Sequence, residues 1–241
     1  MIRPNLRPAA MVLAILMISS NAGAQQPEKR DGTEPTTLNP GKSSGILTDR
    51  LTKSQLKAWR SIIEIVLAKD GEGRPIHPKL HALYQQAEAS GQVIFVELTT
   101  QSSSYGSLGW SKVEPRAEGS SKGIVVLRLN LGLIGQARVS ERNQRADGFI
   151  PFKGLGTKER YAEVLGHELT HAVLLLLDAH YLGLYRERKA KVYSSSPDSQ
   201  SIDSLTSLIE GPAEGAEQEI WRELRKCRGT KSDQSLPCRN D

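Results

Sequence analysis

Two histidines and a glutamate stand in an otherwise apolar stretch, GHELTHAV at residues 166–173. His167 and His171 are four residues apart, so on a helix they project from the same face, separated by about 6 Å along the axis. Both imidazoles can then bind one metal ion. Burying such polar groups without partners would cost several kcal/mol, and a metal ion compensates for that loss. The spacing therefore predicts a metal site on a buried helix.

Glu168 follows His167 directly, about 100° further around the helix. That rotation keeps its carboxylate out of the ligand pair but near the open side of the metal, where water would bind. A carboxylate in this place can act as a general base on the water. Glu168 is therefore the candidate catalytic residue.

The His-Glu-x-x-His pattern resembles the active-site helix of the zincin metallopeptidases. The metzincin subclass is excluded, because its pattern requires glycine at 174 and histidine at 177, where this chain has leucine. Downstream, EGPAE at 210–214 is similar to the Glu-Gly-x-Ala-Glu segment of the gluzincins. That resemblance implies that Glu210 is the third zinc ligand and that Glu214 supports a ligand histidine from behind. We interpret Glu217 and Glu219 as exposed residues of a surface helix.

The resemblance implies a Zn²⁺-dependent metallopeptidase that hydrolyses a peptide or protein substrate. Glu168 would deprotonate the attacking water and later return the proton to the leaving amine. One of Tyr181, Tyr185 and Tyr193 is expected to bond the oxyanion, and no spacing selects among them. Two alternatives stay open: a catalytically silent binding protein on the same scaffold, and a metal-dependent amidase that acts on cell-wall material.

Hydrophobic periodicity predicts one α+β domain over residues 47–241. The resemblance implies that this domain is zincin-like, with a small mixed sheet packed on the motif helix and a second, C-terminal helix. Helices are expected from Thr52, with Leu56, Trp59, Ile63 and Val66 on one face, over 78–91, from Thr157 to about His180, and over 211–227. Strands are expected at 92–98 and 123–131, the second offering an edge to an extended peptide. Residues 182–208 are expected to form an exposed polar connection.

The N-terminal 24 residues combine Arg3 and Arg7, an apolar run and the small-residue pattern Ala22-Gly23-Ala24, which predicts a bacterial signal peptide. Residues 25–46 are polar and predict a disordered leader. The mature protein is then secreted or periplasmic, with no stable membrane anchor, and Cys227 and Cys238 are expected to form a disulfide. The formal net charge of +5 is spread along the chain and does not favour a nucleic-acid partner.

Overall fold

A computed structural model describes residues 44–100, 107–114, 123–141, 144–145 and 148–226. The predicted signal peptide, all but the end of the predicted leader, and both cysteines, Cys227 and Cys238, lie outside the described residues. The signal peptide and the disulfide therefore stay predictions.

The chain builds a small mixed sheet in the order β1-β2-β4-β3. Its strands are β1 (Gly45–Leu47), β2 (Val93–Thr99), β3 (Gly109–Glu114) and β4 (Ile124–Asn130). The first three strands in this order are parallel, and β3 lies antiparallel to β4 at the edge. The sheet thus begins at Gly45, within the segment assigned to the leader. Because β4 pairs on both sides, our expectation that it is an edge strand was wrong.

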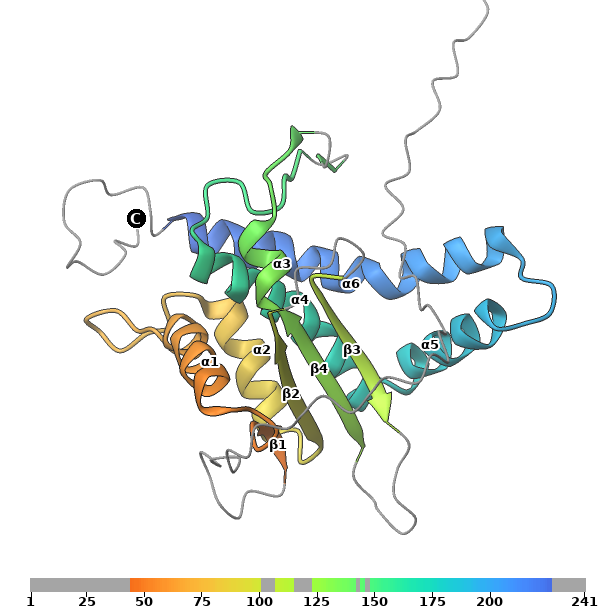
Figure 1. Cartoon of the computed structure of the whole chain (residues 1–241), viewed down its shortest axis with the longest axis horizontal. Helices are drawn as coiled ribbons and strands as arrows, with labels where there is room; N and C mark the ends of the chain where they lie inside the picture. Colours follow the sequence, from red (N-terminus) through yellow and green to blue (C-terminus); the bar gives the residue numbers. More distant parts are fainter. Residues whose placement is uncertain (1–43, 101–106, 115–122, 142–143, 146–147, 227–241) are drawn as a thin grey trace, which may run out of the picture.

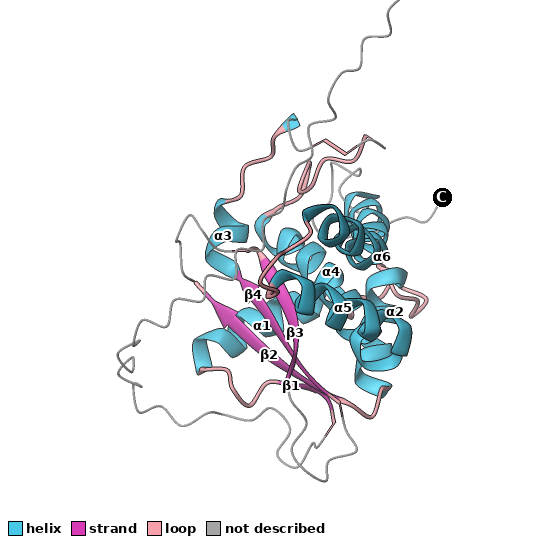
Figure 2. Cartoon of the chain, turned by 90° about the vertical axis from the view of Figure 1, so that its right-hand side faces the viewer, coloured by secondary structure: helices cyan, strands magenta, loops and turns pink. Residues whose placement is uncertain are grey.

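The described residues also form six helices, which confirms the α+β class. They are α1 (Lys53–Val66), α2 (Pro78–Ala89), α3 (Leu131–Gln136), α4 (Thr157–Leu177), α5 (Ala179–Val192) and α6 (Ser199–Lys226). In Figure 1, α4 runs behind β3 and β4 and contacts both strands. Figure 2 shows α2, α4, α5 and α6 together on one side of the sheet. Alternating β-strand residues fill the space between the sheet and these helices, namely Ile94, Val96, Leu98, Val125, Leu127 and Leu129.

Helix α1 begins where its sequence offers a cap. The Thr52 side chain accepts from the backbone N–H of Gln55, whose own side chain accepts from the Thr52 N–H. Its buried face includes Leu56, Trp59 and Val66 as expected, but the fourth member is Ile62 and not Ile63. Ile63 is half-buried, because it lies one helical step to the side of the core.

Helix α4 carries the motif and is the central helix of the fold. It contacts α1, α2, α6 and the two strands β3 and β4, so most of its side chains are buried. It ends at Leu177 and does not reach His180. Asp178 adopts an extended backbone and its side chain caps α5 by accepting from the Tyr181 N–H at 3.0 Å. The predicted polar connection over 182–208 was therefore wrong, because helices α5 and α6 occupy most of it.

Helix α6 begins at Ser199, twelve residues before the predicted start, and continues through Pro212. A proline inside a helix has no N–H to donate to the carbonyl four residues earlier, which here belongs to Leu208. Leu208 is 58% exposed, so water can reach this part of the helix. Among the described residues, no helix is long and apolar enough to cross a membrane.

Candidate metal centre

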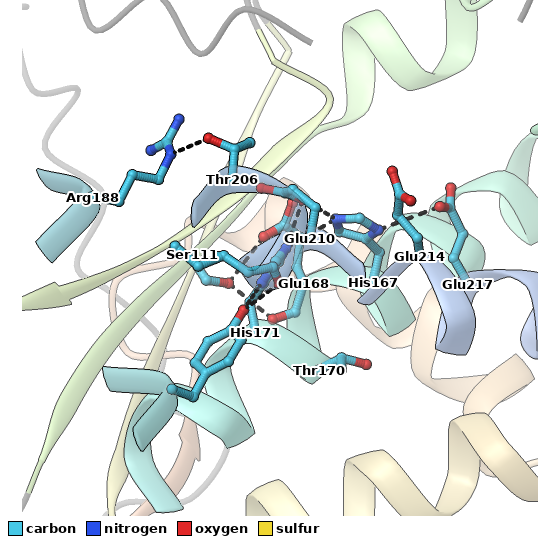
Figure 3. Close-up of polar contacts among 12 residues, drawn as sticks. Ser111, His167, Glu168, Thr170, His171, Arg188, Thr206, Glu210, Glu214 and Glu217 are labelled. Atoms are coloured by element: carbon cyan, nitrogen blue, oxygen red, sulfur yellow. Dashed lines mark hydrogen bonds and ion pairs between the residues drawn. The ribbon is translucent and has the colours of Figure 1, made fainter. Parts of the chain in front are cut away.

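Three side chains from α4 and α6 converge at one point. His167 and His171 lie on the face of α4 that meets α6, and Glu210 reaches them from α6 (Figure 3). The Nε2 atom of His171 lies 3.1 Å from His167 Nε2 and 3.2 Å from Glu210 Oε2. The third separation, from His167 Nε2 to Glu210 Oε2, is 3.5 Å. The structure thus brings together the three residues that the sequence analysis assigned to the metal.

These separations, 3.1, 3.2 and 3.5 Å, are close to those of a tetrahedral metal site, and two of them are slightly shorter. Zinc binds histidine nitrogen and carboxylate oxygen at about 2.0 to 2.2 Å, which places neighbouring ligand atoms of a tetrahedron about 3.3 to 3.6 Å apart. Two histidines and one glutamate are also a donor set of catalytic zinc sites, in which the fourth position stays open. The residues present therefore fit a zinc ion by both spacing and chemistry.

The charges around this point favour a cation. Burial by itself lowers the pKa of His167, but hydrogen bonds to Glu210 and Glu217 outweigh burial and raise the pKa to about 10. Burial by itself raises the pKa of Glu210, but its hydrogen bonds with the two histidines hold that pKa below its ordinary value. A positive charge between the carboxylate and the rings is thus favourable, and a metal ion supplies one.

The other ring nitrogen of His167 contacts Glu217, which lies about one helical turn beyond Glu214, the residue that we expected there. Its Nδ1 atom lies 3.4 Å from Glu217 Oε2, and the same oxygen accepts from Arg145 Nη2 at 2.7 Å. Glu214, which was expected to support a ligand histidine, has a side chain that is 48% exposed, and its described ion pair is with Arg145 at 3.9 Å. The place expected for Glu214 is therefore taken by Glu217.

Helical periodicity explains this difference. A residue seven positions after Glu210 lies within about 20° of it around the helix, whereas a residue four positions on lies about 40° away. Glu217 also belongs to the buried stripe of α6 and is 7% exposed, so the prediction that it is an exposed residue was wrong. The buried stripe through Ala213, Ala216 and Ile220 was a signal that could have identified it.

The three tyrosines after the motif lie in different environments. Tyr181 is buried, Tyr185 is half-buried and Tyr193 is 52% exposed. The Tyr181 hydroxyl lies 2.5 Å from Nδ1 of His171 and donates to the backbone carbonyl of Ile209 at 2.9 Å. The hydroxyl of Tyr181 thus lies behind a candidate ligand.

Glu168 lies beside the candidate ligands but is not one of them. The Ser111 hydroxyl of β3 lies 3.0 Å from its Oε2 atom and 2.9 Å from its backbone oxygen. Burial raises the pKa of Glu168, while the two histidines and the Ser111 hydrogen bond oppose that rise. A carboxyl group that holds a proton more readily than usual is suited to accept one from water. Ser111 was not predicted, because nothing in the sequence shows which strand passes the motif helix.

Gly166 allows the close approach of α6 to the motif. A side-chain carbon at this position would overlap with the Cδ1 atom of Ile220 on α6. A larger residue directly before His167 would therefore require the buried Ile220 side chain to shift where α4 and α6 meet.

A second carboxyl group, Glu163, is fully buried one turn before His167. Its Oε1 atom accepts from the Phe152 N–H at 3.5 Å, and its Oε2 atom has no hydrogen-bond partner among the residues that the structure describes. Burial, together with the negative charge of Glu217, raises its pKa to about 9. Phe152 has a φ of 63°, a left-handed conformation that is costly for a bulky residue. The backbone is thus held in a strained form where it meets Glu163.

No protein-family model, no curated protein and no solved structure matches the chain. The assignment of the candidate metal centre therefore rests on the geometry described above.

Proposed function

We propose that this chain is an exported, zinc-dependent metallopeptidase of gluzincin type. One observation carries the proposal: His167, His171 and Glu210 present three ligand atoms within 4.8 Å of one another. The two helices that supply them are separated in sequence by α5, so the fold itself must create this arrangement. Glu168 lies beside the group, which is where a catalytic base is needed and a structural metal site has no use for one.

His167, His171 and Glu210 would hold the zinc ion. When bound, zinc supplies a Lewis acid that polarises a carbonyl group and makes water more acidic. The Glu168 carboxylate would take a proton from the attacking water and give it to the amine that leaves. The Ser111 hydroxyl would keep that carboxylate oriented while it does so.

Strand β3 is the segment that we propose to position the substrate. In the described part of the chain it pairs with β4 alone, and its Ser111 contacts Glu168. An extended peptide that adds to a free strand edge is held by backbone hydrogen bonds. Such a peptide on β3 would run past the base, which favours a peptide over a small-molecule substrate.

The test is metal content followed by activity. Purified mature protein should contain about one zinc per chain, lose it to a strong chelator, and regain it on addition of zinc. Casein hydrolysis should follow zinc content through this cycle. Protein that takes up no zinc contradicts the metal centre. Zinc uptake with hydrolysis of isolated cell-wall material and not of casein would favour the amidase, and zinc uptake without any hydrolysis would favour a silent binding protein.

A further inference from the structure

The Tyr181 hydroxyl contacts two groups that belong to the candidate metal centre. Tyr181 lies in the first turn of α5, where Asp178 fixes its backbone, and its side chain is 4% exposed. The hydroxyl oxygen lies 2.5 Å from His171 Nδ1 and 2.9 Å from the carbonyl oxygen of Ile209. One side chain of α5 thus joins the motif helix to α6.

The hydrogen-bond roles of these groups are fixed by a count of protons. A carbonyl oxygen can only accept, so the single hydroxyl proton of Tyr181 must go to Ile209. The hydroxyl oxygen must then accept from His171, which requires a proton on Nδ1. A neutral imidazole carries only one such proton, so the lone pair of His171 lies on Nε2. That is the nitrogen that faces His167 and Glu210.

The second contact fixes another ligand. Ile209 directly precedes Glu210, so a hydrogen bond to its carbonyl restrains the backbone from which the Glu210 side chain extends. The same hydroxyl therefore sets the position of α6 relative to the His171 ring. Gly166 allows the two helices to approach, and Tyr181 determines how they align at the ligands.

We propose that Tyr181 is a positioning residue that holds His171 in its metal-binding tautomer and places Glu210 beside it. The inference rests on the metal centre proposed above. It replaces the expectation that a tyrosine after the motif bonds the oxyanion: the Tyr181 hydroxyl is behind the ring, at Nδ1, and its contacts are with His171 and Ile209. A residue in this place supports ligands and does not touch substrate.

The test compares Tyr181→Phe with Tyr185→Phe in the mature protein. Tyr185 lies one turn later on the same helix and is half-buried, so its variant controls for the loss of a tyrosine hydroxyl from α5. Zinc affinity, measured by competition with a chromophoric chelator, should fall about 10 to 100-fold in Tyr181→Phe, as for other groups that support metal ligands. Tyr185→Phe should stay within about twofold of the wild type. Equal affinities in Tyr181→Phe and the wild type would overturn the inference.

Activity at saturating zinc separates the two roles of the tyrosine. Positioning predicts that excess zinc restores most of the turnover of Tyr181→Phe. An oxyanion role predicts unchanged zinc affinity with turnover lowered about 10² to 10³-fold, which is the loss seen when such a donor is removed. That second pattern would refute the positioning role while leaving the proposed peptidase intact. A wild type that binds no zinc would instead refute the metal centre itself.

A measurement on the wild type keeps the inference testable if Tyr181→Phe does not fold. Nitrogen-15 NMR of the zinc-loaded protein should show His171 bound through Nε2, with a slowly exchanging proton on Nδ1. In folded Tyr181→Phe this proton should exchange faster, whereas in Tyr185→Phe it should not. Zinc on Nδ1, or a rapidly exchanging Nδ1 proton in the wild type, would contradict the proposal.

Discussion

Gly109 on β3 lies so close to Glu168 on α4 that a side-chain carbon at residue 109 would be 2.8 Å from both Cγ and Oε1 of the glutamate. It would also lie 3.1 Å from the carbonyl oxygen of Arg128 on the neighbouring strand. The backbone of Gly109 does not require glycine, since its φ is not left-handed. The strand therefore needs glycine here because of the Glu168 side chain, and not because of its own conformation.

Gly109→Ala should displace the Glu168 carboxylate and lower peptidase turnover by about 10-fold or more, since a small misplacement of a catalytic group is costly. Zinc content should stay at the wild-type level, because the three ligands are elsewhere. Gly71→Ala is the matched control: nothing lies within 4 Å of its added carbon, so both activity and zinc should be unchanged. Wild-type turnover in Gly109→Ala would show that Glu168 tolerates displacement or is not the base.

Glu168→Gln should retain zinc and lose most of the turnover, about 10² to 10⁴-fold, because the amide keeps the shape of the side chain but accepts no proton. Ser111→Ala provides a graded comparison, since it leaves the carboxylate in place and removes only its hydrogen bond. We expect Ser111→Ala to lower turnover by about tenfold at most. Activity assays on zinc-saturated protein test both predicted losses of turnover. If the Glu168→Gln variant turns over substrate at the wild-type rate, Glu168 has no part in the mechanism.

The motif could be read from the sequence because helix spacing is local. A four-residue separation places His167 and His171 on one face whatever the rest of the chain does. The third candidate ligand, Glu210, lies 39 residues after His171, and only the resemblance to the gluzincin segment pointed to it. The approach of Glu210 to the two histidines depends on Gly166, on helix α5, which connects α4 to α6, and on the buried face of α6. No local sequence pattern specifies any of these.

The residues that hold the candidate ligands and Glu168 in place were the least predictable part of the site. Ser111, Arg145 and Tyr181 come from a strand, a loop and a helix, and no sequence spacing links them to the motif. The preference for Glu214 over Glu217 followed a family pattern instead of the buried stripe of this helix. Helix α5 was missed because the Ser- and Asp-rich stretch at 194–204, which follows it, led us to expect one exposed connection over 182–208, and the cap that Asp178 offers to α5 was overlooked.

The three glutamates of α6 should differ in their effect on zinc. Glu210→Gln removes a ligand charge and should release zinc readily to a mild chelator. Glu217→Gln keeps an oxygen that can accept from His167, so we expect a loss of affinity of about tenfold, at the low end for supporting groups. Glu214→Gln should stay within about twofold, because its side chain is 48% exposed and contacts neither ring. Chelator competition ranks the three, and a larger loss in Glu214→Gln than in Glu217→Gln would contradict this geometry.

Cys227 and Cys238 should be linked in protein exported to an oxidising compartment. Thiol labelling of the denatured, unreduced chain should then modify neither residue, and reduction before labelling should expose both. Such a link closes a short loop and should stabilise the protein by about 2 to 3 kcal/mol. The double variant Cys227→Ser with Cys238→Ser is the control for the label, and labelling of both residues without reduction would refute the pairing.

Glu163 should make the folded protein less stable as pH rises. Its pKa is about 9 in the folded state, because burial and the Glu217 charge disfavour the ionised form, against 4.5 as the ordinary value. Between these values the folded state holds a proton that the unfolded state has lost, so the free energy of unfolding must fall as pH increases. The loss from Glu163 alone between pH 5 and pH 7 is roughly 2 to 3 kcal/mol.

Glu163→Gln has the same shape, keeps an oxygen for the Phe152 N–H and cannot ionise. Denaturant unfolding of both proteins in chelator, at pH 5, 6 and 7, should therefore show the variant gaining stability over the wild type as pH rises. Glu187→Gln is the matched control, because Glu187 is exposed on α5 and pairs only with Lys191 among the described contacts. Glu159→Gln is unsuitable, since Glu159 caps α4. The stability difference of Glu187→Gln from the wild type should be the same at all three pH values, and a Glu163→Gln difference that is equally flat would mean that Glu163 is ionised in the folded protein.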